Sequence, residues 1–486
     1  MSSFADDTRW LDATSQADLV RSGEVTASEL TEAAIERIEA IDPALNAVVL
    51  RWFERSREWA AGKLPDGPFR GVPFLLKDLY APMAGTPMTN GNRALLDSRW
   101  VAPSDSTLVS RYRRAGLVTL GRTNSPEMGS VPTTEPVHFG PTHNPWALDR
   151  SPGGSSGGSG AAVAAGLVPI AHASDGGGSI RIPASACGLV GLKPSQGRIT
   201  MGPLVDESGL GVQHCVSRSV RDTAALLDAT CGPGIGDTVI AAAPLRPYLM
   251  EVGADPGRLR IGVLDHRPQG GPAIHPQCAL AAQDAATLLA SLGHHVEEAY
   301  PKALEDTDLT SRFMAMWAAN MAIGCQRIAE AIGRPVTEDD FEPMNWAQAQ
   351  MAQRSSAVDY AMALFAVSQF RRRMHQWWTP VADGGEGFDL LLTPTLGDLP
   401  PILGTMVNRR GENPLRPVAL AGQLVPFTPP ANTTGQPAIS LPLHWTAEGL
   451  PVGIHLVAGY GREDVLIRVA AQLEGAQPWA DRHPAV

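Results

Sequence analysis

The chain has 486 residues, of which 44% are hydrophobic and 18% charged, a composition that excludes a disordered or fibrous protein. Its 39 basic and 50 acidic residues leave a net charge of −11. We therefore expect no binding of nucleic acid or of an anionic membrane, because both need a basic surface. No apolar stretch approaches the ~20 residues that cross a bilayer, and no leader segment is visible, so the sequence predicts a cytoplasmic protein.

Cysteine and histidine patterns give no sign of a metal site. The five cysteines are far apart, with no C-x-x-C pair and no Cys/His cluster at zinc spacing. The motifs H-E-x-x-H and G-x-x-x-x-G-K-[ST] are also missing from the sequence, which excludes the common zinc-protease and nucleotide-binding interpretations. We expect reduced, buried thiols, no metal and no cofactor.

The N-terminal part, residues 1–70, is predicted to be helical. Thr26 and Glu29 have the spacing of a capping box. After them, apolar residues recur at helical spacing and fall on one face of a helix: Leu30, Ala34, Ile38 and Ile41. We expect these helices to dock on the rest of the molecule.

From residue 71 onward, short apolar runs alternate with amphipathic stretches. The runs are typical of strands buried on both faces and lie at 72–76, 117–121, 167–173, 259–265, 389–395, 438–443 and 453–458. Helices are expected between several of them, for example at 276–292 and 462–473. This alternation predicts an α/β fold with a central mixed β-sheet covered by helices on both faces. We expect one domain, with a catalytic core at 71–230 and the C-terminal part of the sheet at 385–475.

Residues 309–378 are predicted to form a helical insertion that covers one edge of the sheet. The segment is rich in large, adaptable side chains, including Met314, Met316, Trp317, Met321 and Trp346. These residues could line a cavity for a bulky apolar ligand, but an ordinary helical core is the more common explanation for such a pattern. Our candidate substrate-binding residues are Met128, Trp317 and Met321.

The chemically informative segment is SPGGSSGGSG, which starts at Ser151. Alone it resembles a flexible linker, but it opens directly into an apolar helix and a buried strand, which linkers do not do. Ser155 and Ser179 are 24 residues apart, and a helix of ~10 Å followed by a strand of ~20 Å allows the two hydroxyls to meet. A glycine/serine loop held between core elements supplies hydroxyls and N–H groups for catalysis.

Gly176, Gly177 and Gly178 immediately precede Ser179. Such a run lets successive N–H groups converge on one oxyanion, which is an arrangement for acyl transfer. The serine needs a base, and Lys77 ends an apolar strand, where loss of hydration lowers the pKa of an ammonium group. A lysine after an apolar run can also be a surface residue that extends its amine to water, and that alternative stays open.

Several linked motifs identify a family resemblance. The stretches GVPFLLKD, GRTNSPEM, GGSSGGSGAAVAAG, SDGGGSIRIPA, GLVGLKPS, TGQPAISLPL and GLPVGIHLVA occur in the order seen in the amidase signature family, from about residue 10 to residue 475. Within it, the chain is most similar to the branch of 6-aminohexanoate cyclic-dimer hydrolases. The resemblance implies a Ser/cis-Ser/Lys triad.

In that triad Ser179 is the nucleophile, Ser155 is the bridging serine next to an unusual cis peptide bond, and Lys77 is the base. The backbone N–H groups of residues 176–179 form the oxyanion hole, and three neighbours support it: Ser156, Asp175 and Arg181. The family usually has Thr-Asp-x-Gly-Gly-Ser before the nucleophile, whereas this chain has Ser174 first and glycine at the third position. This departure predicts that the backbone N–H groups of the oxyanion hole are held less rigidly.

The resulting prediction is a serine hydrolase that cleaves C–N bonds of linear or cyclic amides with bulky apolar or aromatic groups. A carbamate or ester hydrolase would use the same triad. A glutamine-dependent amidotransferase subunit would share the motifs but need a partner chain. A non-catalytic binding protein would be expected to lose the lysine or a serine, and all three residues are present. We expect a small-molecule amide or carbamate as substrate, and a monomer or homodimer.

Overall fold

The computed structural model describes residues 1–203, 208–408 and 411–486. Within these residues eleven strands form one sheet in the order β1-β3-β2-β4-β6-β5-β10-β11-β9-β7-β8. The strands are β1 (Val48–Arg51), β2 (Pro73–Lys77), β3 (Val118–Thr123), β4 (Ile170–Asp175), β5 (Val190–Lys193), β6 (Val212–Ser217), β7 (Arg260–Val263), β8 (His295–Glu298), β9 (Leu390–Pro394), β10 (Ala438–Trp445) and β11 (Pro451–Ala458).

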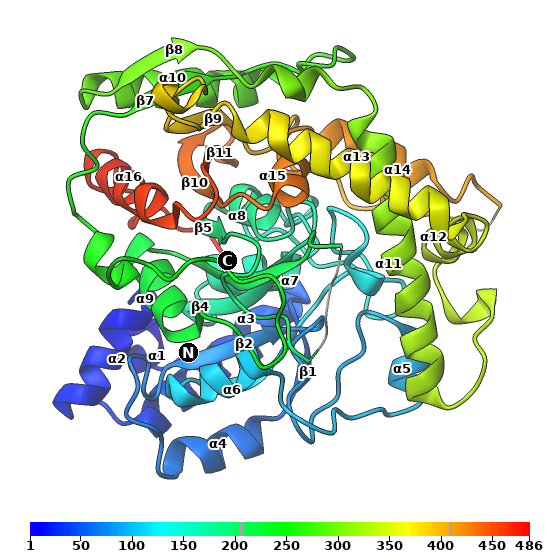
Figure 1. Cartoon of the computed structure of the whole chain (residues 1–486). Helices are drawn as coiled ribbons and strands as arrows, with labels where there is room; N and C mark the ends of the chain where they lie inside the picture. The colour runs from blue at the N-terminus through cyan, green and yellow to red at the C-terminus, as the bar shows by residue number, and fades with distance from the viewer. Residues whose placement is uncertain (204–207, 409–410) are drawn as a thin grey trace.

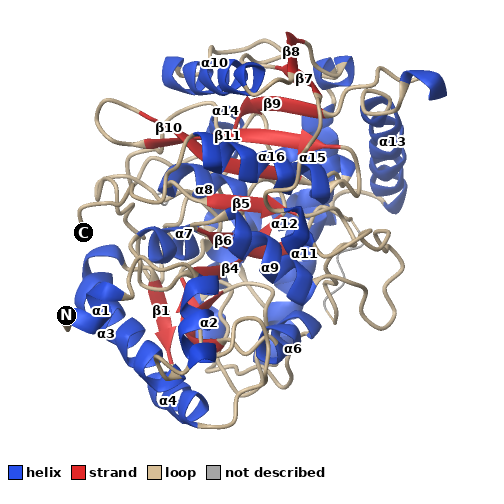
Figure 2. Cartoon of the chain, turned by 90° about the vertical axis from the view of Figure 1, so that its left-hand side faces the viewer, coloured by secondary structure: helices blue, strands red, loops and turns tan. Residues whose placement is uncertain are grey.

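Helices pack on both faces of this sheet (Figures 1 and 2). They are α1 (Ser3–Asp7), α2 (Ala13–Ser22), α3 (Ala27–Leu45), α4 (Phe53–Ala61), α5 (Arg93–Asp97), α6 (Thr107–Arg114), α7 (Gly157–Ala164), α8 (Arg181–Cys187), α9 (Val220–Thr230), α10 (Pro276–Ser291), α11 (Leu309–Ile332), α12 (Pro343–Gln353), α13 (Ala357–His375), α14 (Arg416–Leu424), α15 (Pro429–Thr434) and α16 (Glu463–Ala476). The expected α/β class with a mixed, helix-covered sheet is confirmed.

The sheet has a core on each face because successive side chains of its strands point to opposite sides. In β2, Phe74 and Leu76 pack into one apolar cluster, which extends to α9, α10 and α16. Leu75 between them packs into the other, which contains α3, α7 and part of α8. Strands buried on both faces therefore carry the unbroken apolar runs that the sequence shows.

The pairing of β2 with β4 positions the site. The two strands are parallel, and Phe74 is paired with Ile170 and Leu75 with Ala171. The carboxyl ends of parallel neighbours lie at the same edge, so Lys77 at the end of β2 is brought level with the end of β4. The loop that follows β4 contains the glycine run.

The predicted elements are largely present. The seven expected strands exist, although the run at 167–173 becomes a strand only at Ile170, and the capping box of Thr26 and Glu29 opens α3. Four strands were not expected: β1, β5, β6 and β8. The first three are short or interrupted by polar residues, and β8 (HVEE) is a polar edge strand that shows no apolar run.

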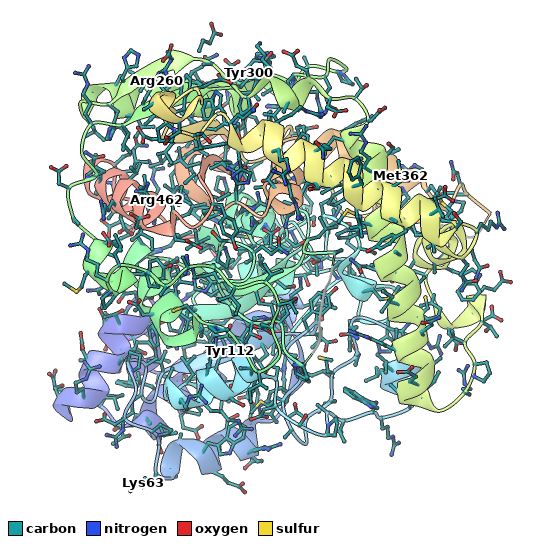
Figure 3. The ribbon with its side chains drawn as sticks, viewed as in Figure 1. Lys63, Tyr112, Arg260, Tyr300, Met362 and Arg462 are labelled. Atoms are coloured by element: carbon teal, nitrogen blue, oxygen red, sulfur yellow. The ribbon has the colours of Figure 1, made fainter. Side chains whose placement is uncertain are left out.

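The predicted helical insertion consists of α11, α12 and α13, which pack on one another at one side of the molecule (Figure 1). Its large side chains differ in surroundings. Met316 and Met321 are buried. Met351 on α12 is about half exposed, and Met362 on α13 is more than half exposed and lies at the outer surface in Figure 3. Only part of the segment therefore faces the interior of the protein.

The remaining features concern the thiols, membranes and metals. All five cysteines are free thiols, and four are buried while Cys231 is half-buried. In the part of the chain that the structure describes, no helix has the length and apolar character needed to cross a bilayer. The same residues contain no group of three or more His, Cys, Asp and Glu side chains arranged to hold a metal ion.

Candidate active site

Lys77 lies at the centre of the site, and its amine is held between two hydroxyls. Its Nζ is 2.6 Å from Ser155 Oγ and 2.9 Å from Ser174 Oγ. The side chain is fully buried, so the surface alternative for this lysine does not apply. Burial lowers the pKa of Lys77 to about 7, and the charge of Asp175 offsets the shift only in part. About half of the amine is thus neutral near pH 7.

His172 shares this environment without being a base. Its Nδ1 accepts the backbone N–H of Lys77 at 3.2 Å, so its Nε2 carries the proton and donates to Gln213 Oε1 at 3.1 Å. Burial and the nearby Lys77 charge lower the pKa of His172 to about 3. The neutral imidazole holds the end of β2 in place.

The two serines expected in the triad come from different segments, Ser155 from the glycine/serine loop and Ser179 from the turn after β4. Ser155 follows a cis peptide bond between Gly154 and Ser155, as the family resemblance implied. Its neighbour Ser156 bridges to β4, because its Oγ donates to the Ser174 carbonyl and accepts the Ser174 N–H. Ser179 is 7% exposed and lines the main cavity. No hydrogen bond joins the hydroxyls of Ser155 and Ser179 in the described structure.

The glycine run forms the turn between β4 and α8. Among the described residues, the N–H groups of Gly176, Gly177 and Ser179 donate to no other protein group. The Gly178 N–H is already engaged, because it donates to Asp175 Oδ1 at 2.7 Å. Gly178 has φ +134°, and a Cβ there would lie 2.3 Å from Thr428 Oγ1, so only glycine fits. We leave Gly178 out of the candidate oxyanion hole.

A buried ion pair fixes this turn. Asp175 accepts the N–H groups of Gly178 and Ile180 and binds Arg181 through two hydrogen bonds of 3.0 Å. Both side chains are fully buried, and the Arg181 charge, outweighing the penalty of burial, holds the pKa of Asp175 well below its usual range. Asn432 completes the pair by donating to Asp175 and accepting from Arg181.

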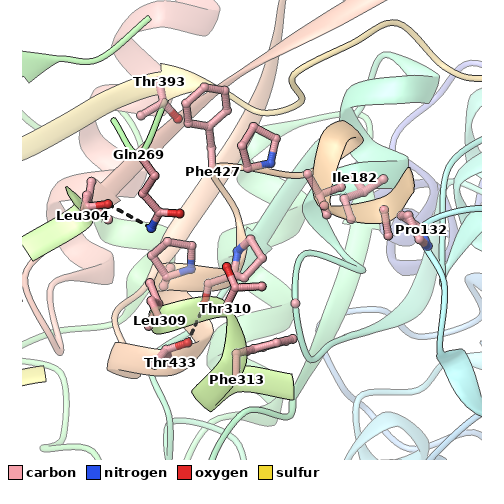
Figure 4. Close-up of a pocket in the computed structure, with 18 of the residues that line it drawn as sticks. Pro132, Ile182, Gln269, Leu304, Leu309, Thr310, Phe313, Thr393, Phe427 and Thr433 are labelled. Atoms are coloured by element: carbon pink, nitrogen blue, oxygen red, sulfur yellow. Dashed lines mark hydrogen bonds between the residues drawn. The ribbon is translucent and has the colours of Figure 1, made fainter. Parts of the chain in front are cut away.

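The cavity above the nucleophile loop has a volume of about 260 Å³ and is mostly apolar. Figure 4 shows Ile182, Phe313 and Phe427 among its walls. Trp317 lines it too, stacked on Phe313 with ring centroids 5.5 Å apart. The two rings cover the glycine run, because a Cβ at Gly176 would lie 3.1 Å from the Trp317 ring.

Of the three expected substrate-binding residues, only Trp317 lies in the wall of the cavity. Met128 and Met321 are buried in a separate apolar cluster against which Trp317 packs, and they are not part of the cavity wall. For Met321 the reason is helical geometry, since it is four residues after Trp317 and continues the buried face of α11 away from the opening. Met128 lies on a different element, the short turn Glu127–Gly129.

Sequence analysis missed four contributors to the site. Ser174 could have been found from the sequence, because it directly precedes Asp175 in the motif, but its hydrogen bond with Lys77 was not predicted. Asn432, Thr428 and His455 come from segments some 250 residues away in sequence, and His455 accepts an Arg181 N–H at 3.0 Å. Only the tertiary structure brings them to the loop.

A buried, partly neutral lysine against a serine hydroxyl, beside a glycine turn with free N–H groups, defines a hydrolase of the serine type. The family model described as Amidase matches residues 29–467, and the chain therefore belongs to the amidase family. The protein is a hydrolase of amide C–N bonds, as its motifs predicted.

Individual relatives are similar over nearly the whole chain. The 6-aminohexanoate-cyclic-dimer hydrolases of Paenarthrobacter ureafaciens and of Pseudomonas sp. (strain NK87) are each 46% identical over 483 residues, covering 98% of this chain and 96% of theirs. The structure of 6-aminohexanoate cyclic dimer hydrolase complexed with substrate superimposes with a TM-score of 0.94 at 45% identity, covering 98% of this chain and 99% of that one. A bacterial aryl acylamidase of the amidase signature family gives 0.84 at 28% identity, covering 97% of each chain.

Proposed function

We propose that this amidase hydrolyses uncharged secondary amides, cyclic or linear, that carry apolar or aromatic groups, through an acyl-enzyme on Ser179. The observation that carries the mechanism is the buried Lys77 amine 2.6 Å from Ser155 Oγ. A neutral amine at that distance can take the hydroxyl proton, and burial supplies the neutral form near pH 7.

In the acylation step, Lys77 accepts a proton from Ser155 while Ser155 accepts one from Ser179. The Ser179 oxygen bonds to the carbonyl carbon, and the carbonyl oxygen takes up the negative charge. The N–H groups of Gly176, Gly177 and Ser179 stabilise this oxyanion. The relay needs Ser179 to turn toward Ser155, an adjustment that is common when substrate fills an empty site.

Collapse of the intermediate breaks the C–N bond. The proton held by Lys77 returns through Ser155 to the leaving nitrogen, which departs as an amine and leaves an ester on Ser179. Water then attacks this ester with the same relay as base, releasing a carboxylic acid and restoring Ser179. Ser156, Asp175 and Arg181 act indirectly by holding the loop.

The cavity supports the proposed substrate class. Arg267 is the only charged residue among the described residues that line it, and its guanidinium donates to the carbonyls of Gly422 and Gln423. The walls therefore suit an uncharged, apolar chain and offer no carboxylate for a free amine. The relatives named 6-aminohexanoate-cyclic-dimer hydrolase support the proposal that this chain also acts on uncharged amides.

The remaining parts of the proposal concern context. The insertion of α11 to α13 serves as the lid of the acyl pocket, with Trp317 as its contact to substrate and with Met128 and Met321 supporting that ring from behind. The chain acts as one catalytic domain with N-terminal docking helices. We place it in the cytoplasm, as a monomer or homodimer that needs no partner chain and takes only small molecules.

The test uses an amide, an anilide, a urethane and an ester that share one apolar acyl group. We expect turnover of the amide and anilide, and labelling of Ser179 by a fluorophosphonate. Ser179→Ala should abolish turnover and labelling while keeping the unfolding midpoint, and Ser291→Ala, at an exposed serine, should keep all three. An adduct on another serine would overturn the assignment, and turnover of only the urethane or ester would favour that alternative.

A further inference from the structure

Gln348 on α12 is a buried amide without partners. It lines the cavity, is 1% exposed, and neither its Oε1 nor its Nε2 makes a hydrogen bond among the described residues. It is the only described side chain for which both amide atoms are buried and unpaired. Buried amides are nearly always hydrogen-bonded in folded proteins, so this one calls for an explanation.

The fold places Gln348 on the catalytic side of the cavity. Asn345, one turn earlier on the same face of α12, donates to the Glu127 carboxylate at 2.7 Å. Glu127 begins the short turn that ends at Gly129, and a Cβ at Gly129 would lie 3.1 Å from Ser155 Oγ. Gln348 and Gly129 both line the cavity, and the Asn345–Glu127 hydrogen bond connects their two segments.

An apolar residue would serve packing better at this position. Leucine or methionine fills similar space without an unpaired donor and acceptor, which destabilise the folded protein when they stay unsatisfied. Pairing within the helix does not remove the problem. Asn345 Oδ1 is also unpaired, and a rotation that brought Gln348 Nε2 to it would still leave Gln348 Oε1 without a donor.

We infer that Gln348 determines specificity by hydrogen-bonding a second, non-scissile amide of the substrate. Its carboxamide offers a donor and an acceptor in a mostly apolar wall, and an amide presents both complementary groups without charge. A site built around such a pair disfavours analogues that lack the group, because the buried amide then stays unpaired. This inference rests on the proposed amide hydrolysis at Ser179.

The test compares two linear substrates with the same scissile amide and spacer. One carries a second amide along the spacer, and the other has two methylenes in its place. We expect wild-type enzyme to have at least tenfold higher kcat/KM for the diamide. Gln348→Met should lower that ratio at least tenfold, whereas Gln353→Met, the same change at an exposed position of α12, should keep it.

Thermal unfolding of the same variants separates recognition from structure. Gln348→Met should melt at the wild-type temperature or above it, because an unpaired buried amide has been replaced. An unchanged ratio, or equal losses on both substrates, would overturn the inference. A substrate with an ester as the second group, which only accepts hydrogen bonds, should lie between the other two if both amide atoms of Gln348 are used.

The two proposals fail in different ways. Cleavage of the monoamide and the diamide that is abolished by Ser179→Ala but insensitive to Gln348→Met overturns the role of Gln348 alone. Absence of cleavage of any amide by the wild-type enzyme overturns the proposed function, and the role of Gln348 is then rejected with it.

Discussion

Lys77 shows how burial converts an ordinary side chain into a candidate base. A lysine amine has an ordinary pKa of about 10.5, so it can work as a base near pH 7 only if its surroundings lower that pKa. The structure lowers its pKa to about 7 because the amine is wholly buried with hydroxyl partners and without a carboxylate in direct contact. The residue type and the apolar run were visible in sequence, but the two serine partners that replace water around the amine were not both identified.

The first prediction concerns the pH dependence of catalysis. Only neutral Lys77 accepts a proton, so kcat/KM should rise with pH through about 7 and level off above it. Lys77→Met should lower kcat/KM by about 10³-fold or more and remove this rise. A stopped assay over pH 5.5–9 with a neutral amide measures both. An unaltered pH profile in Lys77→Met would show that another group is the base.

The same lysine affects stability with a definite sign. Between pH 7 and 10.5 the unfolded chain binds a proton on Lys77 that the folded chain has lost, so its contribution to folding stability becomes more favourable as pH rises through this window. Below pH 7 the folded protein carries a buried charge. Lys77→Met should therefore raise the melting temperature most at pH 6, while the activity is lost.

At the scale of elements, α11 divides its large side chains between a cavity and a core. Phe313, Met314 and Trp317 line the cavity, and Met316 and Met321 are buried against neighbouring helices. Both interpretations of the insertion, pocket and core, therefore apply, to different side chains of one helix. Sequence alone could not separate them, because residues four positions apart, such as Trp317 and Met321, share one helix face.

The second prediction follows from the position of Trp317. Trp317→Ala should change the relative kcat/KM for amides with small and large acyl groups by about 10- to 100-fold, because this ring lines the cavity that we propose holds the acyl group. Trp346 provides a matched control, since it is stacked on Phe341 in the same insertion and lies outside the cavity wall. Trp346→Ala should lower the melting temperature and keep the substrate ranking. The reverse pattern would assign Trp317 to the core.

At the scale of the whole molecule, the Asp175–Arg181 pair joins segments that are distant in sequence. Arg181 donates to the Thr428 carbonyl before α15 and to His455 on β11, and Asn432 contacts both members of the pair. The turn that carries Ser179 is thus fastened to the C-terminal part of the sheet.

The third prediction tests this fastening. Asp175→Asn leaves the Arg181 charge buried without its counter-ion, which should lower the free energy of unfolding by about 3–5 kcal/mol, as measured by urea titration. Activity should fall as well, because Asp175 positions Gly178 and Ile180. Asp383→Asn, at an exposed acid, should stay within about 0.5 kcal/mol of wild type. Equal stabilities of the two variants would contradict the structural role of the pair.

The pH dependence of this pair has the same sign as that of Lys77, because both pKa values are lowered in the folded protein, but it lies at acid pH. The pKa of Asp175 is lowered, so its stabilising contribution is fully present above the pKa of an unfolded aspartate, about 4, and is lost as the pH falls below that value. Asp175→Asn should therefore be most destabilised relative to wild type at neutral pH.

The fold class, the family and the motif that carries Lys77, Ser155 and Ser179 could be predicted from local patterns: apolar runs, glycine spacing and residue order. The groups that surround these three residues depend on packing between distant segments. A glutamine in a helix with few apolar residues looks like a solvent-facing residue until the packing of α12 buries it, and a polar strand such as β8 exists because a neighbour supplies its hydrogen bonds. Burial and pairing between residues hundreds of positions apart follow from the global packing energy, which no local window contains.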